Sequence, residues 1–283
     1  MRRAAVLGSP VAHSLSPVVH RAGYEAAGLA GWSYDAIECQ EGELARLVAG
    51  LGPEWAGLSL TMPLKEVALA VADRVALLPE ALGAANTLVR EPDGRWRADN
   101  TDAPGMVEAV GPVHRPATVV VLGAGGTARA ALGAAARLGA SRVTVVARRA
   151  EAVARLEPVA AGLGIAVVPH RWSAAAEVIG PADLVISTVP RGVADPLSGQ
   201  VVWRPDTVLL DALYDPWPTP LAAAAAAAGC RVVSGLDLLL AQAVGQFQLF
   251  TGVPAPVEAM HAALMGGALG DRGTGARQRG VTD

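Results

Sequence analysis

The sequence is almost devoid of lysine: one lysine, Lys65, stands against 22 arginines. The two cations differ chemically, because a guanidinium stays protonated in proteins whereas an ammonium can release and recover a proton. Lys65 is therefore the first candidate for acid–base chemistry. The alternative is that one lysine survived a compositional drift toward arginine, and composition by itself does not separate the two interpretations.

Cysteine and histidine are also scarce. The two cysteines, Cys39 and Cys230, lie far apart in the sequence and suggest no disulfide framework, so we expect reduced, structural thiols. The five histidines show no metal-ligand spacing with each other or with the cysteines. The sequence therefore predicts no metal site.

Long apolar runs and an excess of basic residues are missing as well. No uninterrupted apolar stretch reaches the roughly 18 residues of a membrane span, and the N-terminal segment breaks at Gly8-Ser9-Pro10, too early for a secretory signal. The net charge of -3, without a basic stripe, excludes the electrostatic footprint of nucleic-acid binding. We expect a cytoplasmic protein, monomer or homodimer, whose partner is a small molecule.

Short β-type runs alternate with Ala- and Leu-rich helical stretches, a pattern typical of α/β proteins with mainly parallel sheets. With 283 residues, 52% of them hydrophobic, the chain is long enough for two domains. A first series of strands is expected at residues 3–8, 32–38, 56–60, 85–90 and 95–99. The last two are expected to form a hairpin, because a Pro-Asp-Gly turn separates them.

A second series of strands follows a Pro- and Gly-containing connector. These strands are expected at residues 118–123, 142–147, 165–169, 183–188, 207–211 and 231–233. The alanine run at 220–229 predicts an ordinary helix, since alanine is the best helix former and Gly229 suits a C-terminal cap. Residues 236–251 predict one long helix that has no place in the second sheet, and the Gly- and Arg-rich tail from residue 266 is expected to be frayed.

A glycine-rich turn directly follows the strand expected at 118–123 and opens a helix. Its pattern is G-x-G-x-x-A: Gly123 permits the tight turn, Gly125 lets the backbone approach a pyrophosphate, and Ala128 allows close helix-to-strand packing. The anion would sit on the exposed amides of the helix start. The strand-turn-helix context favours dinucleotide binding over a purely structural turn. The predicted cofactor-binding residues here are Gly123, Ala124, Gly125, Gly126, Thr127 and Ala128.

Two arginines, Arg148 and Arg149, stand at the end of the next strand, where an NAD-binding domain usually has an acidic residue for the ribose hydroxyls. Two guanidiniums there would attract a 2'-phosphate, so the sequence predicts NADP rather than NAD. The alternative is a pair of solvated arginines that open a helix.

Seven sequence blocks suggest a known family. They are GSPVAHSLSP, SLTMPLKE, GAANTLV, DNTDAPG, GAGGTAR, DALYDPWPTPL and GLDLLLAQAVGQFQLFTG, all between Val6 and Gly252. In their order and spacing the chain resembles the shikimate dehydrogenase family. The resemblance implies an NADP-dependent oxidoreductase of aromatic amino-acid (chorismate) biosynthesis that interconverts 3-dehydroshikimate and shikimate.

The resemblance also implies the domain organisation of an α/β protein. The implied parts are a substrate-binding catalytic domain at 1–104, a Rossmann-type doubly wound NADP-binding domain at 105–235, and C-terminal helices at 236–265 that return to the substrate domain. The tail at 266–283 is expected to be flexible because of its composition.

The same resemblance assigns roles to individual residues. Lys65 and Asp102 are the implied catalytic pair: Lys65 delivers a proton to the developing alkoxide, and Asp102 orients the amine and binds a hydroxyl. Whether Lys65 also acts as the base in the reverse direction stays open, because the carboxylate favours the charged ammonium whereas partial burial favours the neutral amine. The implied substrate-binding residues are Ser14, Ser16, Thr61, Asn86, Tyr214 and Gln242.

The local sequence is compatible with these roles. Ser14 and Ser16 precede Pro17, which suits a first helical position, and hydroxyls at a helix N-terminus can hold a carboxylate. Ser16 could instead be only an N-cap. Lys65 is expected on the first turn of a helix. Tyr214 is equally compatible with a core position.

Asparagine is also scarce, and the chain differs from the family pattern at a few positions. The two asparagines of the chain, Asn86 and Asn100, both fall inside the family blocks, which favours functional roles. Ser59 stands where the family commonly has asparagine, and Ala147-Arg148-Arg149 where it has Asn-Arg-Thr. A quinate-type relative that uses NAD is one alternative function, and the arginine pair and Ser16 argue against it. A non-catalytic nucleotide-binding sensor is another, against which the Lys65 and Asp102 pair argues.

Overall fold

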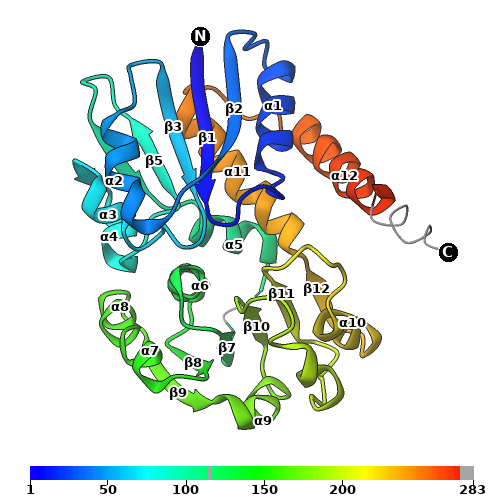
Figure 1. The fold of residues 1–283 in the computed structure, drawn as a ribbon. Coiled ribbons are helices and arrows are strands. Elements are labelled where there is room, and N and C mark those ends of the chain that lie inside the picture. Colours follow the sequence, from blue (N-terminus) through cyan, green and yellow to red (C-terminus); the bar gives the residue numbers. More distant parts are fainter. Residues whose placement is uncertain (114–115, 275–283) are drawn as a thin grey trace, which may run out of the picture. The chain divides into compact units, whose positions relative to one another are not determined.

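The computed structural model describes residues 1–113 and 116–274, and for residues 268–274 it describes the backbone alone. The chain divides into two compact units. Unit 1 comprises Met1–Arg74, Asn86–Ala98 and the chain from Ala243, and unit 2 comprises Val75–Ala85 and Asp99–Gln242. Each unit is built on a six-stranded sheet (Figure 1). The predicted α/β class with two successive sheets is confirmed.

The sheet of unit 1 is mixed. Its strands are β1 (Arg2–Gly8), β2 (Trp32–Glu38), β3 (Trp55–Leu60), β4 (Arg74–Val75), β5 (Thr87–Arg90) and β6 (Trp96–Asp99), in the order β2-β1-β3-β5-β6-β4. β1 is parallel to β2 and β3, whereas β5 is antiparallel to β3. In the predicted hairpin of β5 and β6, the Glu91 amide donates to the Arg95 carbonyl at 2.8 Å. Of these six strands, only the short strand β4 is not predicted from the sequence.

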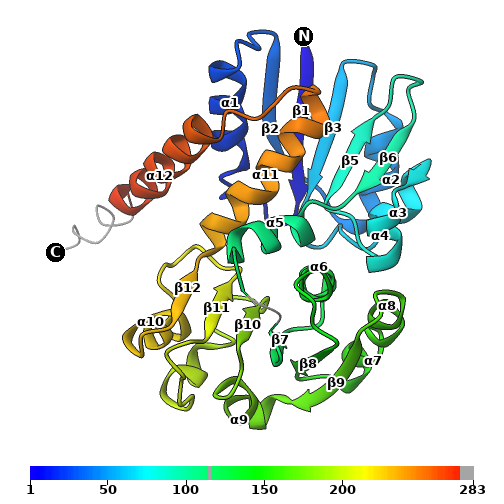
Figure 2. The ribbon, with the colours of Figure 1, turned by 180° about the vertical axis from the view of Figure 1, so that it is seen from behind.

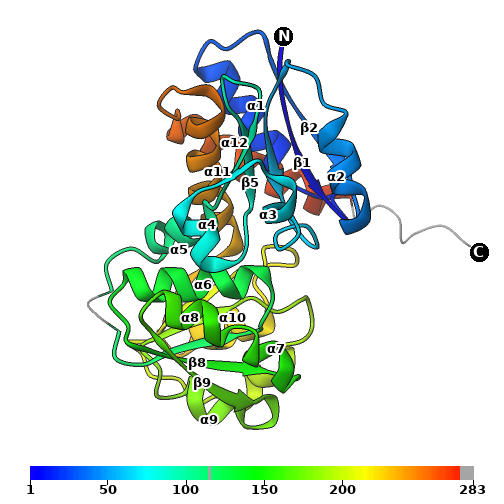
Figure 3. The same ribbon diagram turned by 90° about the vertical axis from the view of Figure 1, so that its left-hand side faces the viewer.

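Helices lie on both faces of this sheet (Figure 3). They are α1 (Ser16–Ala26), α2 (Glu41–Ala49), α3 (Ala68–Val71), the latter part of α11 (Gly235–Thr251) and α12 (Val257–Thr274). α11 crosses one face of the sheet (Figure 2), where a Cβ at Gly57 of β3 would lie only 2.0 Å from the Phe250 ring. A glycine in the strand therefore lets the helix approach closely, and the predicted return of the C-terminal helix to the first sheet is confirmed.

α12 packs against α1, and its Met260 and Leu264 are buried. The helix continues to Thr274, so residues 266–274 of the tail that we expected to be frayed are helical. One reason is tertiary: a Cβ at Gly267 would lie 3.3 Å from Val18 of α1, a close approach that local propensity does not reveal. Residues 275–283 of the predicted tail lie outside the described residues.

A buried aromatic cluster joins α1, β2 and α11. The ring of His20 stacks on Tyr34, with centroids 4.2 Å apart and planes within 8°, and Phe247 lies 6.5 Å away. Burial lowers the pKa of His20 from 6.5 to about 3, and the Gln246 side chain opposes this lowering only in part. His20 is therefore neutral in the folded protein at neutral pH.

We expect this neutral histidine to make unit 1 acid-sensitive. Between pH 6.5 and about 3 the unfolded chain binds a proton at His20 that the folded chain does not, so stability is full above this window and falls as the pH decreases. The slope of about 1.4 kcal/mol per pH unit predicts a loss of about 2 to 3 kcal/mol between pH 7 and pH 4.5. Urea unfolding of the wild type and of His20→Phe at both pH values measures it.

The control for this experiment is His13→Phe, at an exposed position, which should leave the pH dependence unchanged. If His20→Phe loses as much stability between pH 7 and pH 4.5 as the wild type, His20 does not cause the acid sensitivity.

The sheet of unit 2 is parallel throughout its paired strands. Its strands are β7 (Val119–Leu122), β8 (Arg142–Ala147), β9 (Ala166–Arg171), β10 (Leu184–Ser187), β11 (Val208–Asp211) and β12 (Arg231–Val233), in the order β12-β11-β10-β7-β8-β9. This is the strand order of a dinucleotide-binding doubly wound sheet, and ligands bind where the order reverses, between β7 and β10. The predicted Rossmann-type domain is confirmed.

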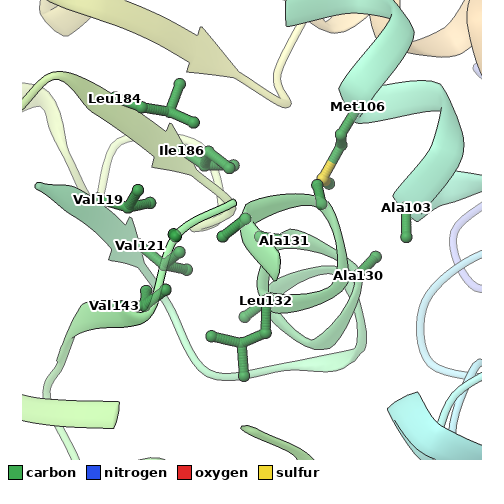
Figure 4. Close-up of a cluster of buried hydrophobic side chains, with 14 of the residues drawn as sticks. Ala103, Met106, Val119, Val121, Ala130, Ala131, Leu132, Val143, Leu184 and Ile186 are labelled. Atoms are coloured by element: carbon green, nitrogen blue, oxygen red, sulfur yellow. The ribbon is translucent and has the colours of Figure 1, made fainter. Parts of the chain in front are cut away.

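The helices of unit 2 pack on this sheet or on one another. They are α4 (Leu77–Leu82), α5 (Asp102–Val110), α6 (Gly126–Arg137), α7 (Ala150–Ala154), α8 (Glu157–Gly162), α9 (Ala175–Ile179), α10 (Pro220–Ala227) and the start of α11, with 3-10 turns at Trp172–Ala174 and Asp195–Gly199. Among them, α6 packs on β7 through small side chains. Ala131 of α6 is fully buried beside Val121 of β7 (Figure 4), so the helix can lie close to the strand. Among the described residues no helix combines the length and hydrophobicity of a membrane span.

Candidate active site

The glycine-rich turn of unit 2 joins β7 to α6 at the reversal of strand order. Gly123 has a φ of +109°, and a Cβ there would lie 2.5 Å from the Thr188 hydroxyl oxygen at the end of β10. A side chain at this position would therefore strain the backbone and fill the turn.

The following residues leave the helix start open. Gly125 is the extended N-cap of α6, and a Cβ placed on it would meet nothing within 4 Å. Ala128, the third small residue of the motif, is fully buried in the core under the helix. An open turn in front of a 12-residue helix fits the pyrophosphate of a dinucleotide, because the first backbone amides of α6 point toward it.

The two predicted phosphate-binding arginines flank the same sheet edge. The amide of Gly123 donates to the carbonyl of Val146 on β8 at 2.9 Å, so the end of β8 lies beside the glycine turn. Arg148 and Arg149 follow directly, both exposed, and Arg149 is the N-cap of α7. The backbone of two exposed arginines therefore follows the strand that lies beside the turn, an arrangement that fits the 2'-phosphate of NADP.

In unit 1, strand ends gather the candidate substrate residues. Thr61 donates its backbone amide to Leu7 at the end of β1, and the Ser9 amide donates to the Met62 carbonyl, both at 2.9 Å. Gly8 makes this approach possible, because a Cβ there would lie 2.2 Å from the Thr61 methyl carbon. The loop that leads to Ser14 and the segment that follows β3 are thereby joined at one sheet edge.

Lys65 lies at this edge but not on a helix. It occupies the turn at residues 62–67 that precedes the short helix α3, and it is half-buried. The prediction that Lys65 lies on the first helical turn is therefore wrong. The turn after Pro63 is irregular, and only the four residues Ala68–Val71 continue as α-helix.

Ser14 and Ser16 lie at the N-terminus of α1, but Ser16 is not the N-cap that the sequence offered as one interpretation. The N-cap is Leu15 and Ser16 is the first helical residue, so Ser16 does not cap the helix. The Ser16 amide instead donates to the Ser14 hydroxyl oxygen at 3.3 Å. Ser16 is 4% exposed, and its hydroxyl interacts with Tyr34.

Asn86 lies immediately beside the end of β3. The amide of Leu60 donates to the Asn86 carbonyl at 2.7 Å, and Asn86 is only 1% exposed. Because β5 runs antiparallel to β3, its first residues are adjacent to the last residues of β3. The structure thus brings Asn86 and Thr61 together although 24 residues separate them in the sequence.

The remaining candidates belong to unit 2. Asp102 is the first residue of α5 and is 6% exposed, a position where the helix N-terminus favours a carboxylate. Asn100 uses its amide structurally: Nδ2 donates to the Ala84 carbonyl at 3.0 Å, and Oδ1 accepts from the Ala103 amide at 3.1 Å. Asn100 therefore has a structural role, in which its side chain joins Ala84 to the first turn of α5.

Gln242 and Tyr214 occupy different elements of unit 2. Gln242 of α11 is 8% exposed and its Nε2 donates to the Leu239 carbonyl at 2.9 Å. Tyr214 is half-buried in the segment after β11. That segment is fixed by Asp211, whose carboxylate accepts from the Thr219 hydroxyl at 2.7 Å and whose pKa is raised by burial.

A set of buried polar residues surrounds Asn86 and is not predicted from the sequence. Gln246 is 1% exposed and hydrogen-bonds to Ser59 and Thr87. One signal was present: Gln246 follows Gln242 by four residues, so both glutamines face the same side of α11. Ser59 differs from the family pattern, and the sequence gives no sign of its buried partners.

Family models match three parts of the chain. They describe the shikimate dehydrogenase substrate binding domain (residues 6–88), the alanine dehydrogenase/PNT C-terminal domain (residues 98–195) and the shikimate 5'-dehydrogenase C-terminal domain (residues 235–265).

Whole-chain relatives carry the same family name. The chain is 39% identical over 262 residues to the shikimate dehydrogenase (NADP(+)) of Caulobacter vibrioides, across 89% of this chain and 90% of the relative. The crystal structure of the Mycobacterium tuberculosis shikimate dehydrogenase is similar with a TM-score of 0.87 and 48% identity, across 94% of this chain and 100% of that one. The shikimate 5-dehydrogenase of Thermus thermophilus in complex with NADP(H) and shikimate gives a TM-score of 0.82 and 33% identity, with 94% and 100% coverage. Because the sequence identity extends over most of the chain and the fold is the same, this chain belongs to the shikimate dehydrogenase family.

Proposed function

We propose that this protein is an NADP-dependent shikimate dehydrogenase that reversibly reduces 3-dehydroshikimate to shikimate for aromatic amino-acid biosynthesis. The observation that carries the proposal is the placement of the single lysine: Lys65 follows β3 at the sheet edge where Thr61 and the buried Asn86 are adjacent. A proton donor beside two hydroxyl-binding side chains suits reduction of a ketone on a polyhydroxylated ring.

NADPH, when bound, supplies the hydride to the ketone carbon. Lys65 stabilises the negative charge that develops on the ketone oxygen and delivers a proton to it. In the oxidative direction its neutral amine takes the proton back. We assign Asp102 the role of orienting the Lys65 amine and of accepting a hydrogen bond from a substrate hydroxyl.

The substrate is held at several points in this proposal. Ser14 and Ser16, at the N-terminus of the 11-residue helix α1, bind the carboxylate, which the helix dipole also favours. Thr61 and Asn86 bind ring hydroxyls. The further residues that we assign to substrate binding are Tyr214 and Gln242.

The cofactor is assigned to unit 2. The turn from Gly123 to Ala128 holds the pyrophosphate against the start of α6, and Arg148 and Arg149 hold the 2'-phosphate. The open Gly125 and the exposed arginine pair support this assignment. The functional boundaries 1–104, 105–235 and 236–265, a cytoplasmic location and a monomeric or homodimeric state belong to the same proposal.

The test is an assay of reduced cofactor by its absorbance, with shikimate or quinate as substrate and NADP or NAD as oxidant. We expect the highest kcat/KM for shikimate with NADP. A preference for quinate with NAD would indicate a quinate-type enzyme, and absence of turnover with every pair would contradict the proposed activity.

A further inference from the structure

A chain of buried hydrogen bonds crosses unit 1 and ends on Asn86. The Tyr34 hydroxyl donates to the Ser59 hydroxyl oxygen at 2.6 Å, and Ser59 donates to Oε1 of Gln246 at 2.7 Å. Nε2 of Gln246 donates to the Thr87 hydroxyl oxygen at 3.0 Å, and Thr87 donates to Oδ1 of Asn86 at 2.8 Å. All five residues are 4% exposed or less.

The donor and acceptor groups give this series of hydrogen bonds one direction. A threonine hydroxyl has a single proton, so Thr87, which accepts from the Gln246 amide, donates its own proton onward to Asn86. The Gln246 amide maintains this order because its Nε2 also donates to the Asn86 backbone carbonyl at 3.1 Å, and a carbonyl oxygen can only accept. Nε2 therefore stays on the Thr87 side, and the accepting Oε1 stays on the Ser59 side. Ser59 and Thr87 are also paired across β3 and β5, which fixes their separation.

The direction of the chain determines how Asn86 is oriented. An asparagine amide is nearly symmetric in shape, and a half-turn about its last bond exchanges donor and acceptor. A proton from Thr87 makes Oδ1 the buried, accepting end, so Nδ2 is the donating end. The backbone of Asn86 is held as well, because its carbonyl accepts from Leu60 at 2.7 Å and from Gln246 at 3.1 Å.

We infer that Thr87 and Gln246 are positioning residues that fix the Asn86 amide so that Nδ2 donates to an oxygen of the substrate. This inference rests on the proposed function, in which Asn86 binds a ring hydroxyl. Asn86 then recognises the hydroxyl as a hydrogen-bond acceptor, and the polarity of that contact is set by residues on β3, β5 and α11 that do not themselves bind substrate.

The test is Thr87→Val, which keeps the shape of the side chain and removes the proton donated to Asn86. We expect KM for shikimate to rise about tenfold, the cost of one misdirected hydrogen bond, with kcat and KM for NADP within about threefold of the wild type. Thr87→Ser keeps the hydroxyl and should restore KM. Thr207→Val is the matched control: Thr207 is equally buried and donates to the Ala182 carbonyl at 2.8 Å in unit 2, so its kinetics should not change.

Thermal unfolding of each variant separates positioning from loss of fold. If Thr87→Val does not fold, Gln246→Met, which removes the amide that donates to Thr87, should raise KM for shikimate in the same selective way. A folded Thr87→Val whose KM for shikimate is within twofold of the wild type overturns the inference. A Thr87→Ser variant whose KM for shikimate rises as much as that of Thr87→Val overturns it as well. A wild type without shikimate-dependent NADP reduction would instead contradict the proposed function.

Discussion

Replacement of Lys65 by arginine is expected to lower kcat for shikimate oxidation at least about a hundredfold while shikimate still binds. Arginine keeps the positive charge that attracts the substrate oxygen, but a guanidinium does not exchange its proton in the range where enzymes work. Positioned proton transfer contributes about a hundredfold to ten-thousandfold to such reactions. Absorbance of reduced NADP measures kcat, and calorimetric titration with shikimate measures binding.

The companion variant is Lys65→Gln, which removes both the charge and the proton. We expect it to weaken shikimate binding in addition to turnover, so the pair of variants separates the electrostatic from the proton-transfer contribution. Near-normal kcat in Lys65→Arg would rule out the assigned role of the chain's single lysine.

Removal of both arginines after β8, as Arg148→Ser with Arg149→Ser, should raise KM for NADP about a hundredfold and leave KM for NAD nearly unchanged. The two guanidiniums are assigned to the 2'-phosphate, which NAD lacks, and each charge-assisted hydrogen bond to a phosphate contributes substantially to affinity. Both side chains are exposed, so the effect should be smaller at high salt. Steady-state kinetics with each cofactor at two salt concentrations measure it.

The matched control is Arg142→Ser. Arg142 is exposed at the first residue of β8, the opposite end of the strand that leads to Arg148, and it should not affect either cofactor. Equal losses with NADP and NAD in the double variant would show that the arginines support the loop in general and do not select the phosphate.

Much of the fold could be predicted from local sequence. The strands of the second sheet are predicted within one or two residues, because β-type runs such as residues 142–147 alternate with stretches of helix formers. The helix at α10 and its C-terminal Gly229, with a φ of +85°, were also predicted. Such strands and helix ends are predictable because residues close together in the sequence determine them.

Two local predictions were wrong for tertiary reasons. Lys65 lies in a turn and not on a helix, since the segment after β3 follows hydrogen bonds to the loop after β1. Residues 266–274 are helical, and the helix has α1 as a packing partner. Asn100, one of the scarce residues that suggested function, uses its side chain to accept a hydrogen bond from the Ala103 amide in the first turn of α5.

The sequence by itself determined the two-sheet α/β architecture, the glycine-rich turn at Gly123 to Ala128 and the position of the arginine pair after β8, because each is read from local patterns of neighbouring residues. Only the tertiary structure decided which polar residues support Asn86. Ser59 and Gln246 are 187 positions apart, yet they hydrogen-bond because α11 returns across β3. A serine or glutamine in a sequence carries no information about a partner so distant, since its hydrogen-bonding capacity is the same in solvent and in the core; the packing of strand and helix selects the partner.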